Sequence, residues 1–215
     1  AAQHAGPAAL VAWLIGLLAV MLVALSFAEI AGALPEAGAI ARLPHYSHGA
    51  MVSAVIGAED SKFCSHSGFD TEAIEEAIEE RLSGERERGA STISQQTAKN
   101  VFLWQGGGFF RKGLEAWFTF LIETIWTKRR IMEVYLNVAE TGIGTYGVEA
   151  GSQRYFNHSA ARLTRDEASR IAAALPSPKR REVVNPSGFT RRYGNTIEAR
   201  IGVVRRDGLD ACVYD

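Results

Sequence analysis

The longest uninterrupted apolar stretch of the chain lies near its beginning. Residues 8–28 contain no charged side chain, and about 20 apolar residues at ~1.5 Å rise each can cross a hydrocarbon layer of ~30 Å. A cleaved signal peptide would have a shorter apolar region, and a buried core helix of this length would normally keep a polar face. We therefore predict a retained transmembrane helix within residues 1–31.

The residues after this stretch indicate its orientation and the next boundary. Glu29 and Glu36 follow it, and the first positive residue after it is Arg42. Such an asymmetry favours a C-terminal domain on the outer side of the membrane. Glycine and proline residues interrupt any regular pattern over residues 32–48, which we interpret as a linker. Residues 49–215 are then enough for one compact domain.

The pattern in this domain is predominantly helical. Periodicity predicts helices over residues 71–82, 91–103, 109–126 and 128–137. A further helix starts at Thr164, with a capping box to Glu167, and stops at Pro176. The first of these helices is rich in glutamate, which indicates a solvated face. Strand-like alternation extends over no more than a few residues, so the expected fold class is mainly α.

A run of three glycines, residues 106–108, separates two helical stretches rich in Phe and Trp. The run lacks the Lys-Ser/Thr of a phosphate-binding loop and does not follow a strand, so we interpret it as a hinge in a surface loop. The apolar side chains on both sides suit either the core or a surface that enters the lipid headgroup layer. They are Val101, Phe102, Leu103, Trp104, Phe109, Phe110, Trp117, Phe118 and Phe120.

The net charge of -1 conceals an asymmetry. Residues 1–98 hold 5 Lys/Arg and 12 Asp/Glu, whereas residues 99–215 hold 18 Lys/Arg and 12 Asp/Glu. The basic half suits phosphates, pyrophosphates or anionic lipid headgroups, or is simply a solvated surface. No nucleic-acid partner is expected, because no recognised reader motif accompanies the charge.

The two cysteines, Cys64 and Cys212, do not form a C-x-x-C motif, so a thiolate metal site is not expected. A disulfide is an alternative in an oxidising compartment. We expect two unpaired, partly buried thiols.

Candidate chemistry is carried by carboxylates and cations in separate segments. Gln95 and Lys99 share one face of a predicted helix at i,i+4 spacing. Arg111 and Glu115 have the same spacing, which suits either a surface salt bridge or a cleft in which cations lie beside a carboxylate. Glu59 lies on another segment, and two carboxylates across a sugar-binding cleft are usual for chemistry at an anomeric carbon.

Four signature patterns connect these segments to a known family. Residues 59–70 match E-D-x-x-F-x-x-H-x-G-x-D, and residues 89–100 match G-A-S-T-I-x-x-Q-x-x-K-N. Residues 111–115 match R-K-x-x-E, and residues 128–137 match K-x-x-I-x-E-x-Y-L-N. Over roughly residues 45–200 the chain resembles the glycosyltransferase family 51 domain of peptidoglycan polymerases. It is most similar to the monofunctional members, because the segment after the anchor leaves no room for a penicillin-binding transpeptidase.

This resemblance implies a lysozyme-like helical head with a smaller membrane-facing jaw, preceded by one N-terminal transmembrane helix. The expected organisation is an anchor segment at residues 1–31, a linker at 32–48 and a catalytic domain at 49–215. The protein would lie in the bacterial inner membrane, with the catalytic domain on the periplasmic side. Membrane lipids and proteins of cell-wall synthesis or division are the expected partners besides the substrate.

The implied substrate is lipid II, a disaccharide-pentapeptide on undecaprenyl pyrophosphate. The 4-hydroxyl of the acceptor sugar would attack the anomeric carbon of the lipid-linked growing chain, so that the pyrophosphate leaves and the centre inverts. No cofactor is required. A divalent cation, Mg²⁺ or Mn²⁺, can accompany the pyrophosphate, although no ligand cluster demands one.

The resemblance also assigns roles to individual residues. Glu59 would be the general base, and Glu115 the second essential carboxylate, which assists the leaving group or places its counter-ions. Lys99 and Arg111 would contact the pyrophosphate. The other substrate-binding candidates are Gln95, Gln96, Ser91, Asn100 and Lys112, and those expected mainly to support the site are Asp60, His66 and Asp70.

Two other functions are consistent with parts of the pattern. A lysozyme-like lytic glycosidase would share the fold and the catalytic glutamate, but such enzymes bind no pyrophosphate and do not need Lys99 and Arg111. A membrane-anchored scaffold without activity would not need four intact charged groups in a cleft.

Overall fold

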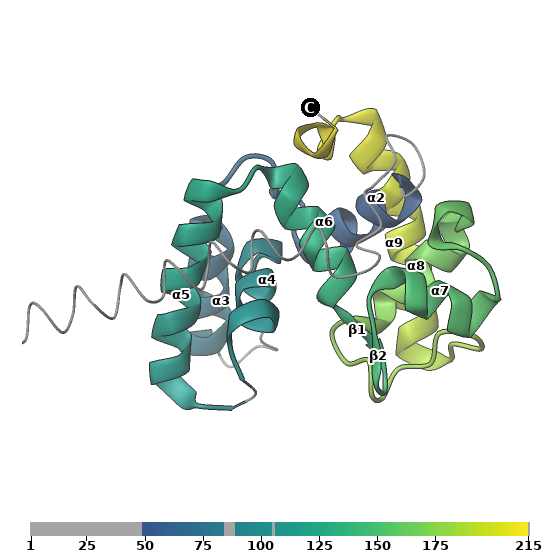
Figure 1. The fold of residues 1–215 in the computed structure, drawn as a ribbon, viewed down its shortest axis with the longest axis horizontal. Coiled ribbons are helices and arrows are strands. Elements are labelled where there is room, and N and C mark those ends of the chain that lie inside the picture. Colours follow the sequence, from purple (N-terminus) through teal and green to yellow (C-terminus); the bar gives the residue numbers. More distant parts are fainter. Residues whose placement is uncertain (1–48, 84–88, 105, 215) are drawn as a thin grey trace, which may run out of the picture. The chain divides into compact units, whose positions relative to one another are not determined.

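The computed structural model describes residues 49–83, 89–104 and 106–214. These residues form eight α-helices, one two-stranded sheet and two short 3₁₀ helices, which confirms the mainly α class (Figure 1). The predicted membrane helix and linker, residues 1–48, lie outside the described residues. Among the helices of the described ranges, none combines the length and the apolar character needed to cross a membrane.

Three helices bury apolar side chains against one another. They are α2 (Gly49–Glu59), α8 (Arg165–Ala174) and α9 (Gly188–Arg206), and each contacts the other two (Figure 1). The seven consecutive residues 51–57 of α2 are buried, so this helix runs through the core, and it ends at Glu59. The sequence analysis predicted no helix over α9, although Ile197, Ile201 and Val204 recur there at helical spacing and are buried.

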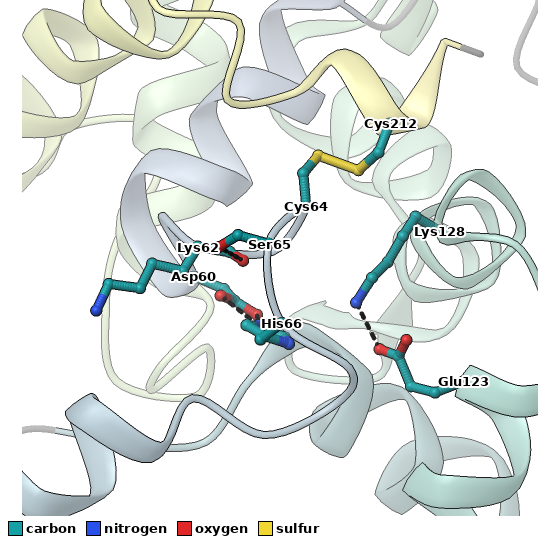
Figure 2. The surroundings of a disulfide bond; sticks show 8 residues. All are labelled: Asp60, Lys62, Cys64, Ser65, His66, Glu123, Lys128 and Cys212. Carbon is teal, nitrogen blue, oxygen red and sulfur yellow. Dashed lines mark hydrogen bonds and ion pairs between the residues drawn. A yellow bond between two sulfur atoms is a disulfide. The ribbon is translucent and has the colours of Figure 1, made fainter.

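A second group contains α4 (Ile93–Phe102), α5 (Gly108–Ile125) and α6 (Lys128–Val138), in which α4 contacts both of the others. These bounds agree with the predicted helices to within about two residues. Glu123 of α5 connects the three helices, because its carboxylate accepts a hydrogen bond from Ser94 of α4 and another from Lys128 of α6. Figure 2 shows the pair with Lys128. The acidic helix α3 (Thr71–Ser83) is also present, and its glutamates lie mostly in solvent, as expected.

The aromatic side chains near the glycine run divide between core and surface. Phe102 stacks on Phe118 with ring centroids 4.8 Å apart. In contrast, Phe109 is 97% exposed and Phe110 is 72% exposed. The core interpretation is therefore wrong for the aromatics that begin α5. Gly107 has φ 91° and precedes α5, where a Cβ atom would lie 2.9 Å from the Cβ of Arg111.

A small hairpin, absent from the predicted elements, follows α6. Strands β1 (Glu140–Gly142) and β2 (Thr145–Tyr146) pair antiparallel and lead into α7 (Val148–Phe156) and the 3₁₀ helix η1 (Ala160–Arg162). Strands this short cannot show an alternating pattern. The hairpin depends on Gly142, because the hydroxyl of Tyr155 occupies the space that a Cβ atom would need.

Two cysteines that are distant in sequence form a disulfide. Cys64 and Cys212 are bonded, with Cα atoms 5.6 Å apart, so the expectation of unpaired thiols is wrong (Figure 2). Cys212 belongs to the 3₁₀ helix η2 (Ala211–Val213) near the end of the chain. The same end is held by Ser53 of α2, whose hydroxyl donates a 2.8 Å hydrogen bond to Asp210 Oδ2. The disulfide therefore joins the chain end to the loop that follows Glu59.

Candidate active site

The carboxyl group of Glu59 is fixed at one oxygen and unpartnered at the other. Gln96 Nε2 donates a 2.8 Å hydrogen bond to Glu59 Oε2, and Tyr135 Oη lies 3.4 Å from Gln96 Oε1, to which it donates. The other oxygen, Oε1, is buried and has no hydrogen-bond partner within the residues that the structure describes. A buried carboxylate oxygen without a donor is costly unless a ligand supplies one.

Burial raises the pKa of Glu59 above the ordinary glutamate value of 4.5. The hydrogen bond from Gln96 and the positive charges of Arg181 and Lys99 oppose this rise, in that order. The burial effect prevails because a carboxylate removed from water loses more solvation than one hydrogen bond and two neighbouring cations restore. A raised pKa brings this carboxyl closer to the range in which a general base works well near neutral pH.

The helix that carries Gln96 is tied to the loop after Glu59. Asp60 Oδ2 accepts a 2.9 Å hydrogen bond from the backbone N–H of Ile93, and the Asp60 carboxylate also contacts His66 Nε2 (Figure 2). Thr92, the N-cap of α4, donates a 2.7 Å hydrogen bond to the carbonyl of Gly68. These bonds fix the first turn of α4 beside the end of α2, which accords with the supporting role expected of Asp60 and His66.

A cleft of about 640 Å³ is lined by Gln96, which hydrogen-bonds Glu59, whereas Glu59 itself is not part of the lining. Its walls come from α4, from the end of α6, from the hairpin and from the segment after α8. The volume lies in the range of sites that hold a sizeable ligand. The polar side chains that line it are Gln96, Lys99, Asn100, Tyr135, Asn137, Glu140, Tyr146 and Lys179.

Arg111, Lys112 and Glu115 form a second charged cluster, on α5. Arg111 Nη1 lies 2.8 Å from Glu115 Oε2, and Lys112 Nζ pairs with Glu115 Oε1. The Glu115 side chain is only 4% exposed and that of Arg111 is 19% exposed, so this is not the exposed surface pair that the spacing alone permitted. None of the three lines the cleft that contains Gln96 and Lys99, so their place in one cleft with these residues stays a prediction. Both carboxylate oxygens of Glu115 are bound by cations, which suits a residue that places positive charge.

Of the other predicted site residues, some line the cleft and others do not. Lys99 and Asn100 line the cleft together with Gln96. Ser91 contributes its backbone carbonyl, which lies 3.4 Å from Gln96 Nε2. Gln95 is buried, and its Oε1 accepts a hydrogen bond from the backbone N–H of Thr92 in the capping box of α4. The Gln95 amide oxygen therefore holds the start of the helix, and a contact with substrate stays a prediction.

Several cleft residues were given no role in the sequence analysis. Tyr135 and Asn137 belong to the Y-L-N signature, which was a signal that could have identified them. Tyr146 comes from the short hairpin, and Lys179 from the segment after α8. Neither carries a sequence signal, because only the tertiary fold brings these segments to the cleft.

A protein site for a metal ion usually needs several acidic, histidine or cysteine side chains close together. In the described part of the chain, no group of three or more His, Cys, Asp or Glu side chains is placed to hold an ion. Lys99 and Arg111 carry positive charge that can meet negative charge on a ligand.

Comparison with known proteins agrees with the patterns in the sequence. The family model described as Transglycosylase matches residues 35–200. The biosynthetic peptidoglycan transglycosylase of Caulobacter vibrioides is 56% identical over 164 residues, which cover 76% of this chain and 72% of the relative. The protein of the same name from Rhodospirillum centenum is 51% identical over 165 residues, covering 77% and 71%. That from Shewanella oneidensis is 59% identical over 139 residues, covering 65% and 60%.

Proposed function

Because this chain belongs to the transglycosylase family and is a peptidoglycan glycosyltransferase, we propose that it polymerises lipid II into glycan strands. Undecaprenyl pyrophosphate leaves in each step, and the configuration at the anomeric carbon inverts. The observation that carries this proposal is the carboxyl of Glu59, which is buried beside the cleft with Oε1 unpartnered and with a raised pKa.

Glu59 acts as the general base. Its free Oε1 accepts the proton of the acceptor 4-hydroxyl as the hydroxyl oxygen attacks the anomeric carbon, while the hydrogen bond from Gln96 keeps the carboxyl group oriented. Catalysis of this kind typically contributes about 10²- to 10⁴-fold in rate. Burial helps, because a less solvated carboxylate with a higher pKa is a stronger base.

Cations on α4 and α5 meet the charge of the leaving pyrophosphate. Lys99 lines the cleft, and Arg111 and Lys112 are held in position by Glu115. Charge-assisted hydrogen bonds from such groups strengthen as the glycosidic bond breaks and negative charge develops on the phosphate. Glu115 then acts through the cations that it orients. A divalent cation on the pyrophosphate stays an expectation, and polymerisation with EDTA against added Mg²⁺ or Mn²⁺ measures it.

We also propose that the enzyme works at the periplasmic face of the bacterial inner membrane, anchored by the helix predicted within residues 1–31. A lipid-linked substrate stays in the bilayer, so the cleft has to lie beside it. Exposed apolar side chains between Trp104 and Ile125 suit contact with lipid headgroups, and α3–α5 would form the membrane-facing jaw beside a lysozyme-like head. The Cys64–Cys212 disulfide suits an oxidising compartment.

A lytic glycosidase is not favoured, because the relatives are named as biosynthetic enzymes. Incubation of the protein with labelled lipid II in detergent micelles distinguishes the two activities. We expect long glycan strands to form while undecaprenyl pyrophosphate is released. Release of short fragments from purified glycan strands, without any polymer from lipid II, would contradict the proposal.

A further inference from the structure

A second cavity, of about 320 Å³, adjoins the cleft. The two cavities share Pro178 and Lys179 in their linings, so a ligand lying in the cleft can extend into the second one. We call this second cavity the side pocket. Its charged lining is strongly asymmetric, since the single acid Glu182 stands against four cations: Arg154, Lys179, Arg180 and Arg181.

Two of these cations are held in place by the protein. Arg154 Nη1 donates a 2.9 Å hydrogen bond to the carbonyl of Ile143 and also contacts Thr145 Oγ1, which fixes it against the hairpin. Arg181 Nη1 donates to the carbonyl of Ala173, and its guanidinium lies 5.1 Å from the ring centre of Phe189. Their positive charge is therefore a fixed part of the side pocket.

The other two cations are available to a ligand. The Lys179 side chain is 66% exposed, and its Nζ is 3.8 Å from Glu140, a loose pair. Arg180 is exposed, and its side chain has no partner among the residues that the structure describes. A pocket with two fixed and two available cations favours an anionic ligand group.

The side pocket also has a cation near Glu59. Arg181 is close enough to Glu59 to lower the pKa of that carboxyl. The ring of Tyr193 lies 5.8 Å from the Arg181 guanidinium, and Tyr193 Oη donates a 2.8 Å hydrogen bond to the carbonyl of Ala58. A glycan strand that reaches Glu59 would thus carry its substituents past this pocket.

On the basis of the proposed function, we propose that the side pocket binds a carboxylate of the peptide stem on a glycan strand held in the cleft. The sugar rings of such a strand are largely neutral, and the pyrophosphate is assigned to Lys99 and Arg111. The stem peptide supplies the remaining anionic groups. A lipid headgroup fits less well, because six of the exposed large apolar side chains lie between Trp104 and Ile125, on other elements, whereas two, Ile143 and Val184, line the side pocket.

The test compares two soluble probes: a peptidoglycan tetrasaccharide with its stem peptides, and the same compound with the carboxylates of its stem peptides converted to amides. Titration calorimetry on the full chain in detergent measures both dissociation constants. We expect the wild type to bind the probe with free carboxylates about fivefold more tightly, since each partly exposed charge pair contributes only a few-fold. Raising the salt concentration should reduce this ratio.

Variants of Arg180 show whether the side pocket causes the preference. Arg180→Gln should lower the ratio to about twofold, Arg180→Glu should lower it further, and Arg180→Lys should preserve it. Arg165→Gln removes an exposed arginine that lines neither cavity and should match the wild type. Thermal melting identifies any variant that fails to fold. If Arg180→Glu does not fold, the difference in probe ratio between Arg180→Lys and Arg180→Gln tests the inference.

Parallel assays separate this inference from the proposed function. If the wild type forms no polymer from lipid II, the proposed function fails. If it forms polymer but binds both probes equally, or if Arg180→Glu keeps the full preference, the side pocket inference is overturned. Vesicle binding tests the alternative ligand. If Arg180→Glu loses the preference for phosphatidylglycerol over phosphatidylcholine vesicles but keeps the wild-type probe ratio, the inference is also overturned, and the result indicates a lipid-headgroup site.

Discussion

At the scale of single residues, the central feature is a glutamate that the fold keeps away from water. Glu59 ends a buried helix, one of its oxygens is held by Gln96, and the other faces no donor in the described part of the chain. Burial alone would favour the protonated form, and nearby cations reduce that effect. The activity of the enzyme should therefore depend on the balance between these two influences.

The pH dependence of the reaction reports this balance. Because Glu59 must be deprotonated to act as a base and its pKa is raised, kcat/KM should fall as pH decreases, with a midpoint above 4.5. Arg181→Gln removes a cation that lowers this pKa, so the midpoint should move to higher pH, whereas Arg181→Lys should leave it nearly unchanged. Initial polymerisation rates across pH measure the midpoint, and a lower midpoint in Arg181→Gln would contradict the assignment.

At the scale of secondary-structure elements, the start of α4 matters most, because this helix carries Gln96 and Lys99. Its N-cap Thr92 closes a capping box with Gln95 and also donates to Gly68 on another segment. Thr164 closes an equivalent box at the start of α8. The two caps therefore differ in their tertiary bonds, which allows a matched comparison.

Thr92→Ala should lower the free energy of unfolding by about 1–3 kcal/mol, the sum of a lost cap and a lost hydrogen bond. It should also slow polymerisation, because the first turn of α4 positions Gln96 against Glu59. Thr164→Ala should cost about 1 kcal/mol and leave the rate unchanged. Urea denaturation and initial rates measure both effects, and equal rates in the two variants would show that the position of α4 is not critical.

The segment from Trp104 to the first turn of α5 should contact lipid. We expect a variant that retains only Trp104, which is 53% exposed, to lose fluorescence in vesicles that contain brominated lipids. A variant that retains only the half-buried Trp126 serves as the control and should be quenched much less. Equal quenching of the two would contradict a membrane-facing jaw.

The sequence predicted elements well where the signal was local. Periodicity placed α4, α5 and α6, and a capping box placed the start of α8, close to their observed bounds. The β1–β2 hairpin is too short to show alternation, and α9 was missed although its apolar spacing was present in the sequence. In the site, the signature residues Glu59, Gln96 and Lys99 were predicted together, whereas Arg181 and Lys179 reach it only through the tertiary fold.

At the scale of the whole molecule, the Cys64–Cys212 disulfide connects the loop after Glu59 to the end of the chain. The cysteines are 148 residues apart in sequence, so no local pattern could have paired them. Cross-linking over so long a loop restricts the unfolded chain strongly, which stabilises the folded state in the chain-entropy account.

Replacement of both cysteines, Cys64→Ser with Cys212→Ser, should lower the free energy of unfolding by about 2–4 kcal/mol. The same loss should follow when the wild type is reduced, and reductant should then have no effect on the double variant. Urea denaturation with and without dithiothreitol measures these changes. An unchanged stability of the wild type on full reduction would show that the disulfide is not a stabilising link.

The most direct test of the account is the rate of lipid II polymerisation by Glu59→Gln. The amide retains the shape of the side chain but cannot accept the hydroxyl proton, so the rate should fall by about 10²- to 10⁴-fold. The variant should melt at or above the wild-type temperature at pH 8, because a carboxylate with a raised pKa destabilises the fold once it is charged. A folded Glu59→Gln enzyme that polymerises lipid II at the wild-type rate would contradict the account.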